Sequence, residues 1–469
     1  MMLPLLTASV AFALGQTPAS TPVPERPVQA RLSFVMGDED FDAPDAGTRL
    51  HAALEARSPE LASGLRAEAA LSFFLNTSGA GQTVGFVDNS SFLRLRYRAS
   101  EWSREEGLML NAYPLSSTRL HLGYEHPVTW ARQAFPVREP GGEPALELRL
   151  DRKRWNAWVA AKSARVNDQL ELEVKRRLGV LVGGGVDVVP SLRVELKAGT
   201  VDRGPAPGPA TLGEELPVRA RGVSGRVQWQ HGAPVGTQVD LSLYEGDPAF
   251  FERFFTPETY PGGVAATVAL EGSLGSQRLE DPERSPGTAK DESFQSAALV
   301  ARLKADFLRV HALAYYRTAT FLQADVPGFP PFQAFTDDNE PRSEVSATLG
   351  VDYRLEELGL TPGLLVRATV PAAFTSQGIQ GLPTAERVFV LLGRNRLYVL
   401  PEGEDRQPVL TVKATLRWDL GTVAGVLGEL AYTRDPNRTT FRDDVTGVAG
   451  PVFETPGSLG GTLLLQARF

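Results

Sequence analysis

Residues 92–98, FLRLRYR, alternate apolar and cationic side chains at a strict period of two. Three arginines occupy every second position, and leucine or tyrosine lies between them. In a β-strand this spacing gives one apolar face and one row of cations. Three kinds of sheet have such faces: a nucleic-acid-binding sheet, a soluble sheet with one wet face, and a membrane barrel with a polar lumen.

The composition of the whole chain argues against the first kind. The 469 residues carry a formal net charge of −8, whereas a nucleic-acid-binding domain normally has a clear basic excess. The chain also has no cysteine, which excludes thiolate metal sites and thiol catalysis. A length of this order suits either several soluble domains or one large barrel.

The first residues predict export. Leu3 to Leu14 form an apolar run of signal-peptide length, and the small residues Ala13 and Gly15 favour cleavage after residue 15. We therefore expect residues 1–15 to be a signal peptide. Residues 16–27 are rich in proline and predict an extended periplasmic tether. No later stretch has about 18 consecutive apolar residues, so we expect no transmembrane helix.

The alternation of residues 92–98 recurs along the chain, for example in 145–151, 191–199, 344–354 and 411–419. About 18 such segments (range about 16–20) have the length of tilted membrane-spanning strands. The connections between them fall into short turns and long polar loops, the latter at 76–90, 126–143, 201–216, 246–262, 276–292, 321–341 and 435–457. Turns on one side and loops on the other are typical of an outer-membrane barrel.

The final stretch, GGTLLLQARF at 460–469, alternates in the same way and ends in an aromatic residue. At this point the chain resembles bacterial outer-membrane β-barrel (porin-like) proteins, whose last strand usually ends in phenylalanine. The resemblance implies that Phe469 is the assembly signal read by the barrel-insertion machinery. The family also favours an aromatic two residues earlier, where this chain has Ala467.

We therefore expect an all-β fold. Residues 28–469 would form a single transmembrane antiparallel β-barrel with long extracellular loops and short periplasmic turns, in the outer membrane of a Gram-negative cell. By parity, the polar faces of its strands would line the lumen. The lumen-facing residues predicted in this way are Arg94, Arg96, Arg98, Arg149, Arg193, Glu195, Lys197, Arg219, Arg221, Arg302, Lys304, Lys413 and Arg417.

Whether these charges line an open channel or fill the barrel stays open at the level of sequence, because inward-folding loops can close a wide barrel. A loop at 247–255 carries four phenylalanines, for which a hydrophobic constriction or a docking patch is one interpretation and packing against the rim is the other. These are Phe250, Phe251, Phe254 and Phe255. Aromatic residues near strand ends predict interfacial girdles, among them Tyr124, Trp155, Trp158, Trp229 and Trp418.

No catalytic motif, metal-ligand spacing or cofactor fingerprint is present in the sequence, so we expect neither an enzyme nor a cofactor or metal. The expected function is a porin-like channel for passive diffusion of small hydrophilic solutes through a charged lumen. The alternative is a non-enzymatic barrel component of an envelope-spanning assembly, in polysaccharide export or surface motility. Expected partners are outer-membrane lipid, the insertion machinery and periplasmic or envelope proteins, and not nucleic acid.

Overall fold

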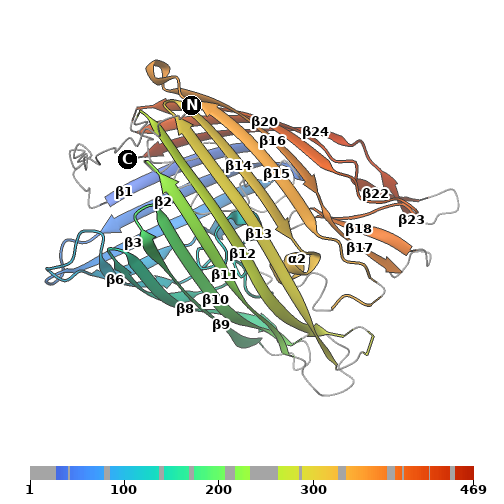
Figure 1. The fold of residues 1–469 in the computed structure, drawn as a ribbon, viewed down its shortest axis with the longest axis horizontal. Helices are drawn as coiled ribbons and strands as arrows, with labels where there is room; N and C mark the ends of the chain where they lie inside the picture. Colours follow the sequence, from blue (N-terminus) through green and yellow to red (C-terminus); the bar gives the residue numbers. More distant parts are fainter. Residues whose placement is uncertain are drawn as a thin grey trace, which may run out of the picture.

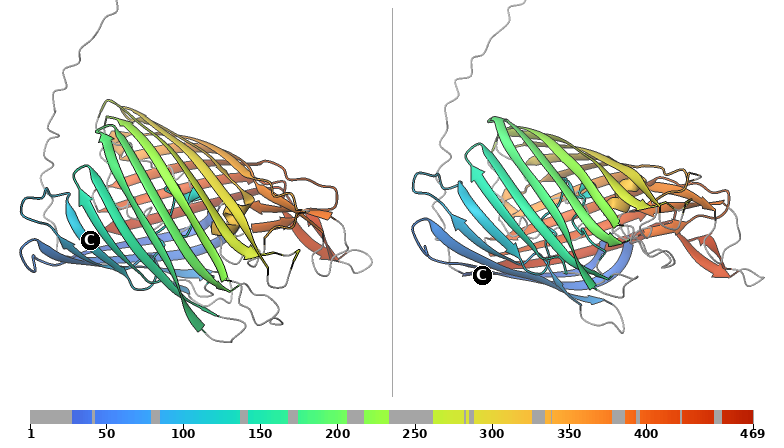
Figure 2. Two further views of the ribbon diagram at one scale, coloured as in Figure 1. Left: turned by 60° about the horizontal axis from the view of Figure 1, so that its bottom comes forward. Right: turned by 90° about the horizontal axis from the view of Figure 1, so that it is seen from below.

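One large antiparallel β-sheet curves around an interior in the computed structural model of the protein (Figure 1; Figure 2). The structure describes residues 28–468 apart from 41–42, 79–84, 137–141, 168–173, 206–216, 233–261, 282, 285–287, 326–333, 338, 378–385, 393–395, 422 and 444–448. The main sheet has 19 strands. Because β4 and β5 both pair with β3, they share one position in the sheet, which leaves 18 positions.

The strands of the main sheet follow one another in chain order. They are β1 (Val28–Asp40), β2 (Ala43–Arg57), β3 (Leu65–Ser78), β4 (Gly85–Asp88), β5 (Phe92–Tyr97), β6 (Gly107–Tyr113), β7 (Ala145–Arg152), β8 (Trp155–Asn167), β9 (Val174–Val189), β10 (Leu192–Pro205), β11 (Pro217–His231), β12 (Val264–Glu280), β13 (Ala289–Ala305), β14 (Leu308–Arg317), β15 (Glu344–Tyr353), β16 (Leu360–Val370), β20 (Val409–Leu420), β21 (Ala424–Arg434) and β24 (Gly457–Arg468). The prediction of an antiparallel barrel of about 18 strands is confirmed.

The last strand, β24, pairs with β21 on one side and with β1 on the other. Each remaining strand pairs with its neighbours in sequence, so the long-range order is that of a chain of hairpins. The strand rich in arginine, β5, lies between β3 and β6.

The two ends of the sheet differ in their connections. At one end, called the turn end, two residues join β7 to β8, β9 to β10 and β13 to β14. Asp306 in the last of these turns has a φ of 50°, a left-handed conformation that aspartate tolerates. At the other end, called the loop end, longer connections include 114–144, 318–343 and 371–408. The expected sorting into turns and loops is therefore present.

One long connection lies at the opposite end from the one expected. Strands β11 and β12 form a hairpin whose paired ends are His231 and Ala266, so residues 232–263 join them at the turn end. The sequence analysis grouped 246–262 with the extracellular loops, and this placement was wrong. The four phenylalanines of that segment lie outside the described residues.

The outer face of the sheet is apolar. In β5, Leu93, Leu95 and Tyr97 are exposed, while the arginines between them are partly buried. The same alternation is complete in β15 and nearly complete in β20. Since a strand buried on one face and in contact with lipid on the other would show this burial pattern, parity assigns the polar faces to the interior.

Smaller elements lie outside the main sheet. Three strands form a separate sheet: β17 (Ala372–Gln377), β18 (Glu386–Leu392) and β19 (Arg396–Val399). Strands β22 (Thr439–Asp443) and β23 (Ala449–Phe453) form another. The helices are η1 (His126–Val128), α2 (Ala319–Asp325) and η3 (Glu356–Leu358). Within the described part of the chain, no helix is both long and apolar enough to cross a membrane.

Candidate channel constriction

The connection between β6 and β7 folds into the interior of the barrel. Residues 114–136 of this connection are called the inner loop. Leu122 and Trp130 pair through two backbone hydrogen bonds of 3.0 and 2.9 Å, and both residues are fully buried. Gly123 follows Leu122 with a φ of 86°, and a Cβ there would overlap the backbone of Val128. The inner loop is therefore a tight hairpin, and it requires glycine at this position.

Lys162 of β8 is the main anchor of the inner loop. Its Nζ donates to the carbonyl oxygens of Leu120, Ala131 and Arg132 at 3.1, 3.0 and 2.9 Å. The side chain is fully buried and also lies 3.3 Å from a carboxylate oxygen of Glu143. An ammonium group has three donors and no acceptor. Three carbonyls and one carboxylate therefore compensate the burial of its charge.

Three further strands hold the inner loop from other sides. A carboxylate oxygen of Glu271 on β12 accepts from the backbone N–H of Glu125 at 3.1 Å. Lys197 on β10 donates to the carbonyl of Gly123 at 2.7 Å, and Arg317 on β14 donates to that of Pro127 at 2.9 Å. Charged inward side chains on opposite parts of the sheet thus fix the inner loop across the lumen.

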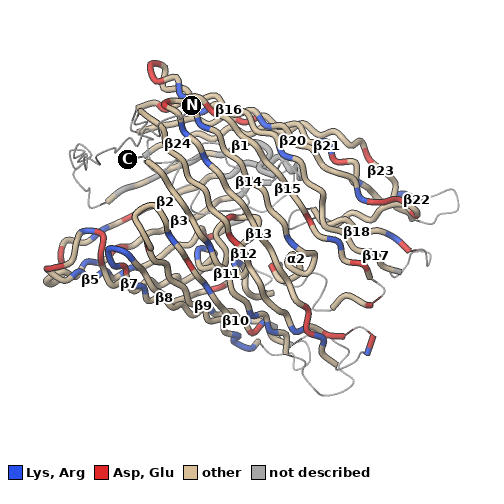
Figure 3. Tube along the Cα trace, viewed as in Figure 1, with Lys and Arg blue, Asp and Glu red and all other residues tan. Residues whose placement is uncertain are grey.

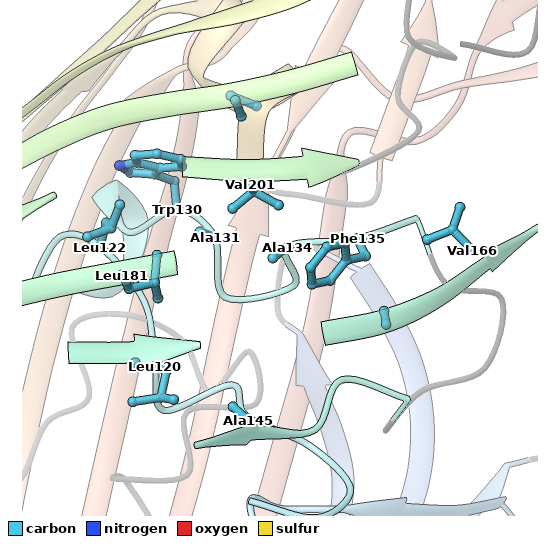
Figure 4. Packing of buried hydrophobic residues seen from close by; sticks show 14 of the residues in the cluster. Leu120, Leu122, Trp130, Ala131, Ala134, Phe135, Ala145, Val166, Leu181 and Val201 are labelled. Carbon is cyan, nitrogen blue, oxygen red and sulfur yellow. The ribbon is translucent and has the colours of Figure 1, made fainter. Parts of the chain in front are cut away.

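Buried apolar residues of the inner loop, α2 and the surrounding strands pack into one core in the loop-end half of the interior (Figure 4). The ring of Phe294 on β13 lies edge-on to Trp130 of the inner loop and to Phe321 of α2, with centroids 5.1 and 5.9 Å away. Gly275 lies directly opposite Phe294 in the ladder, and a Cβ at that position would overlap the ring. The glycine therefore makes room for the aromatic side chain on which both inserts pack.

Two polar cavities lie against the inner faces of β3 and β5–β10. We call this part of the barrel interior the open wall. The smaller has a volume of about 210 Å³ and lies beside the inner loop, lined by His121, Tyr124, Glu147, Arg149 and Lys197 among others. Burial and the nearby cations Lys197 and Arg132 lower the pKa of His121 well below its usual range. His121 is therefore neutral near pH 7.

The larger cavity has a volume of about 610 Å³ and lies at the turn end. Six arginines and two glutamates line it. The arginines are Arg57, Arg66, Arg94, Arg96, Arg98 and Arg104, and the glutamates are Glu60 and Glu68. A chain of hydrogen bonds links the two cavities, because Arg94 donates to Asn111 at 2.6 Å and Asn111 donates to Glu147 at 2.8 Å. A polar, mainly cationic surface thus extends along the open wall.

The opposite side of the interior is different. We call the inner faces of β14–β16, β20 and β21 the paired wall. Its cations lie in buried ion pairs: Arg309 with Asp352 at 2.7 Å and Lys413 with Glu429 at 3.2 Å. Arg417 on the same wall lies 2.7 Å from Asp419. These charges are matched within the wall and are shielded from solvent.

The structure places most of the predicted lumen residues on inner faces. On the open wall these are Arg94, Arg96, Arg149, Arg193, Glu195 and Lys197, and Arg98 lines the larger cavity just beyond the end of β5. Arg302 and Lys304 lie on the inner face of β13, and Lys413 and Arg417 lie on the paired wall.

Arg219 and Arg221 were assigned to the wrong face. Both are exposed and share the outer face of β11 with Val223, while Val218 and Ala220 are fully buried inside. Apolar residues on the inner side reverse the expected parity here, because β11 passes the apolar core of the loop-end half.

The girdle prediction holds for some aromatic residues and fails for two. Trp155, Trp229 and Trp418 are exposed on the outer face. Trp158 and Tyr124 instead line the smaller cavity, since one lies on the inner face of β8 and the other in the inner loop. Phe469 lies outside the described residues, as do the signal peptide and the tether.

Residues 126–143 were expected to be one of the long polar loops, and inward folding was left open without being assigned to this connection. One signal was available. Leu120, Leu122, Trp130 and Phe135 are large apolar side chains in a connection between strands, and all four are buried. Large apolar side chains are usually buried, so four of them in one connection indicate that it packs inside the protein.

No protein-family model matches this chain, and no curated protein matches it. Several solved structures are similar to it over most of their length. Pseudomonas aeruginosa OccK3 (OpdO) has 12% sequence identity and a TM-score of 0.47, covering 94% of this chain and 95% of its own.

Two structures of Pseudomonas aeruginosa OpdK have a similar likeness. The structure with vanillate has 8% identity and a TM-score of 0.48, covering 94% of this chain and 98% of its own. The structure described as the outer membrane protein opdK has 8% identity and a TM-score of 0.47 at the same coverage. At these scores, the fold of this chain rests on its own strand pairings.

Proposed function

We propose that this protein is an outer-membrane channel for small hydrophilic solutes, and that it favours anionic ones. The loop end would face outward and the turn end the periplasm, as in outer-membrane barrels. Transport rather than catalysis is proposed, because the polar groups of the interior line cavities or hold the inner loop.

The observation that carries the preference for anions is the charge of the larger cavity. Its six arginines outnumber its two glutamates, although the chain as a whole is acidic. Confined cations in a water-filled lumen attract anions and repel cations. Guanidinium groups also match the geometry of carboxylates, which they bind through two parallel hydrogen bonds.

The inner loop would be the constriction. It occupies the interior beside the smaller cavity, which has a volume of about 210 Å³ and is lined by the cations Arg149 and Lys197 and the carboxylates Glu147 and Glu195. A volume of this order accommodates solutes the size of a small organic acid. Mixed charges at such a constriction select by orientation as well as by net charge.

Single-channel recording of the purified, folded protein in a planar bilayer tests the proposal. A potassium chloride gradient should give a reversal potential of the sign expected for anion preference. Adding a small carboxylate should produce brief blockages of the current. A barrel that serves as a structural part of an envelope assembly would conduct no more than the bare membrane, and that result would reject the channel.

A further inference from the structure

Five arginines gather on the outer face of the barrel, at the loop ends of four strands. They are Arg165 on β8, Arg176 on β9, Arg219 and Arg221 on β11, and Arg278 on β12. All five are exposed. Figure 3 shows blue positions gathering where these strands reach the loop end. We call them the arginine cluster; they take no part in the lumen described above.

The arginine cluster contains two like-charged pairs. Arg165 lies directly opposite Arg176 in the ladder of β8 and β9, and Arg219 lies directly opposite Arg278 in that of β11 and β12. Residues directly opposite each other have Cβ atoms about 5 Å apart, and like charges there are destabilising. An anion between them would turn this repulsion into attraction.

Carboxylates of the same face neutralise the arginine cluster in part. Asp202 lies opposite Arg219, and Asp291 lies opposite Arg278. Asp202 also lies 3.8 Å from Arg177, so its charge is shared with a further cation. Among the described residues of this face, five arginines therefore lie near two carboxylates, which gives an excess of positive charge there.

The arginine cluster lies where the apolar outer face ends. Farther along the outer faces of β9, β11 and β12, toward the turn end, lie Leu178, Val223 and Leu274, which are 58%, 46% and 60% exposed. Outward arginine costs about 2–4 kcal/mol at the membrane midplane but about 0–1 near the interface. The cluster therefore fits the headgroup level of the leaflet at the loop end.

Within the part of the chain that the structure describes, the outward loop ends of β15, β20 and β21 carry no opposed arginine pair. At the loop ends of β15, β20 and β21 the outward residues include Val345, Leu410 and Tyr432, all large and exposed. One outward arginine, Arg434 at the end of β21, lies opposite Leu410 and Gly457. Among the described residues, the outward pairs of opposed arginines therefore lie on one side of the barrel.

We propose that the arginine cluster binds the phosphate groups of anionic lipid headgroups in the outer leaflet. This inference rests on the proposed function, which sets the membrane orientation. Guanidinium groups bind phosphate through paired, charge-assisted hydrogen bonds. A headgroup with two phosphates would bridge the two like-charged pairs. Lipid would then be ordered against β8–β12 and not against the opposite side of the barrel.

The test titrates the folded barrel, in non-ionic detergent, with a lipid that carries two phosphates on its headgroup. Binding is read by native mass spectrometry. A neutral lipid with the same acyl chains measures the contribution of the chains. The variant is R165Q/R176Q/R219Q/R278Q, which removes both like-charged pairs. The matched control is K153Q/R154Q, which removes two exposed cations from the turn between β7 and β8, at the opposite end of β8 from Arg165.

We expect the fourfold variant to bind the diphosphorylated lipid about tenfold more weakly, as loss of charge-assisted contacts implies, while the control binds like the parent. Equal binding by the variant and the parent would overturn the proposal, and so would equal loss in the control. Displacement of the lipid by millimolar inorganic phosphate would show a site for free phosphate instead.

Heat-modifiable gel migration establishes that the variants are folded. Channel recording on the same preparations separates this inference from the proposed function. Conductance that persists while lipid binding is unaffected by the substitutions overturns the lipid site alone. Absence of conductance in the parent protein overturns the channel.

Discussion

The two walls of the lumen use the same kinds of residue in different ways. On the open wall, Arg94 and Arg149 keep 28% and 35% of their side-chain surface exposed. On the paired wall, Arg309 and Lys413 keep 3% and 0%. A count of inward cations would treat the two walls alike. Under the proposed function, charges with access to water would contribute to solute selection, while the buried pairs of the paired wall would not.

The largest effect is expected from breaking a pair on the paired wall. Lys413→Met leaves the buried carboxylate of Glu429 without its 3.2 Å partner. Removing one member of a buried ion pair costs about 3–5 kcal/mol of unfolding free energy. Urea titration of the folded barrel in detergent measures this loss.

The double variant K413M/E429L serves as the control for that experiment. Because two apolar side chains replace the pair, it should recover most of the lost stability. Channel selectivity should be the same in all three proteins. A loss below about 1 kcal/mol in the single variant would contradict the difference between the walls.

The next largest effect concerns the anchor of the inner loop on the open wall. Lys162→Met removes the three hydrogen bonds to the loop's carbonyls. We expect a loss of about 2–4 kcal/mol, since the three carbonyls stay buried without their donor. Glu143 loses its cation but still accepts from the backbone N–H groups of Ala134 and Phe135. The single-channel conductance should rise about twofold or more as the loop leaves the lumen.

Lys153→Met is the matched control, because Lys153 is exposed in the turn between β7 and β8. It should conduct like the parent protein. If Lys162→Met shows a steady current of unchanged size, the loop is held without the lysine and the constriction lies elsewhere.

A smaller effect in free energy is expected from the exposed arginines. The variant R94Q/R96Q removes two cations from the larger cavity. The ratio of anion to cation permeability should fall about two- to threefold, because the confined positive charge decreases. Stability should change by less than about 1 kcal/mol, as for solvent-exposed ion pairs. Unchanged reversal potentials would show that solutes do not pass this cavity.

The smallest effect is a pH dependence. The pKa of His121 is lowered in the seated inner loop, first by burial and then by Lys197 and Arg132. The inner loop packed in the lumen therefore binds fewer protons than an inner loop that has left the lumen, because a solvent-exposed histidine titrates near pH 6.5. This contribution to seating is fully present above that pH and is lost as the pH falls below it.

Conductance fluctuations should accordingly become more frequent as the pH falls below about 6.5. His121→Asn retains a polar side chain that cannot titrate and should remove this dependence. A variant that still responds to acid in the same way would assign the effect to another group.

The sequence was sufficient for most of the architecture. Alternation at period two, as in residues 92–98, predicts strands and their faces directly, because each inward residue is two positions from the next. The sorting of turns and loops follows from connection lengths. Both are local properties of the chain, and the prediction needs no knowledge of which strands meet.

The constriction could not be predicted in the same way. The inner loop is held by Lys162, Lys197 and Glu271, which come from strands far apart in sequence. Its position depends on the curvature of the whole sheet. For the same reason the parity of Arg219 and Arg221 failed, since the apolar core that reverses it is built from the inner loop and α2. Sequence alone also could not tell the open wall from the paired wall.

Phe294 carries a further consequence. Its ring contacts Trp130 of the inner loop and Phe321 of α2, two segments almost 200 residues apart in the chain. Displacing either segment removes one ring contact from Phe294 and so weakens the packing of the other segment against Phe294. The two inserts are thus expected to yield together, so that the passage opens in one cooperative step and not by gradual widening.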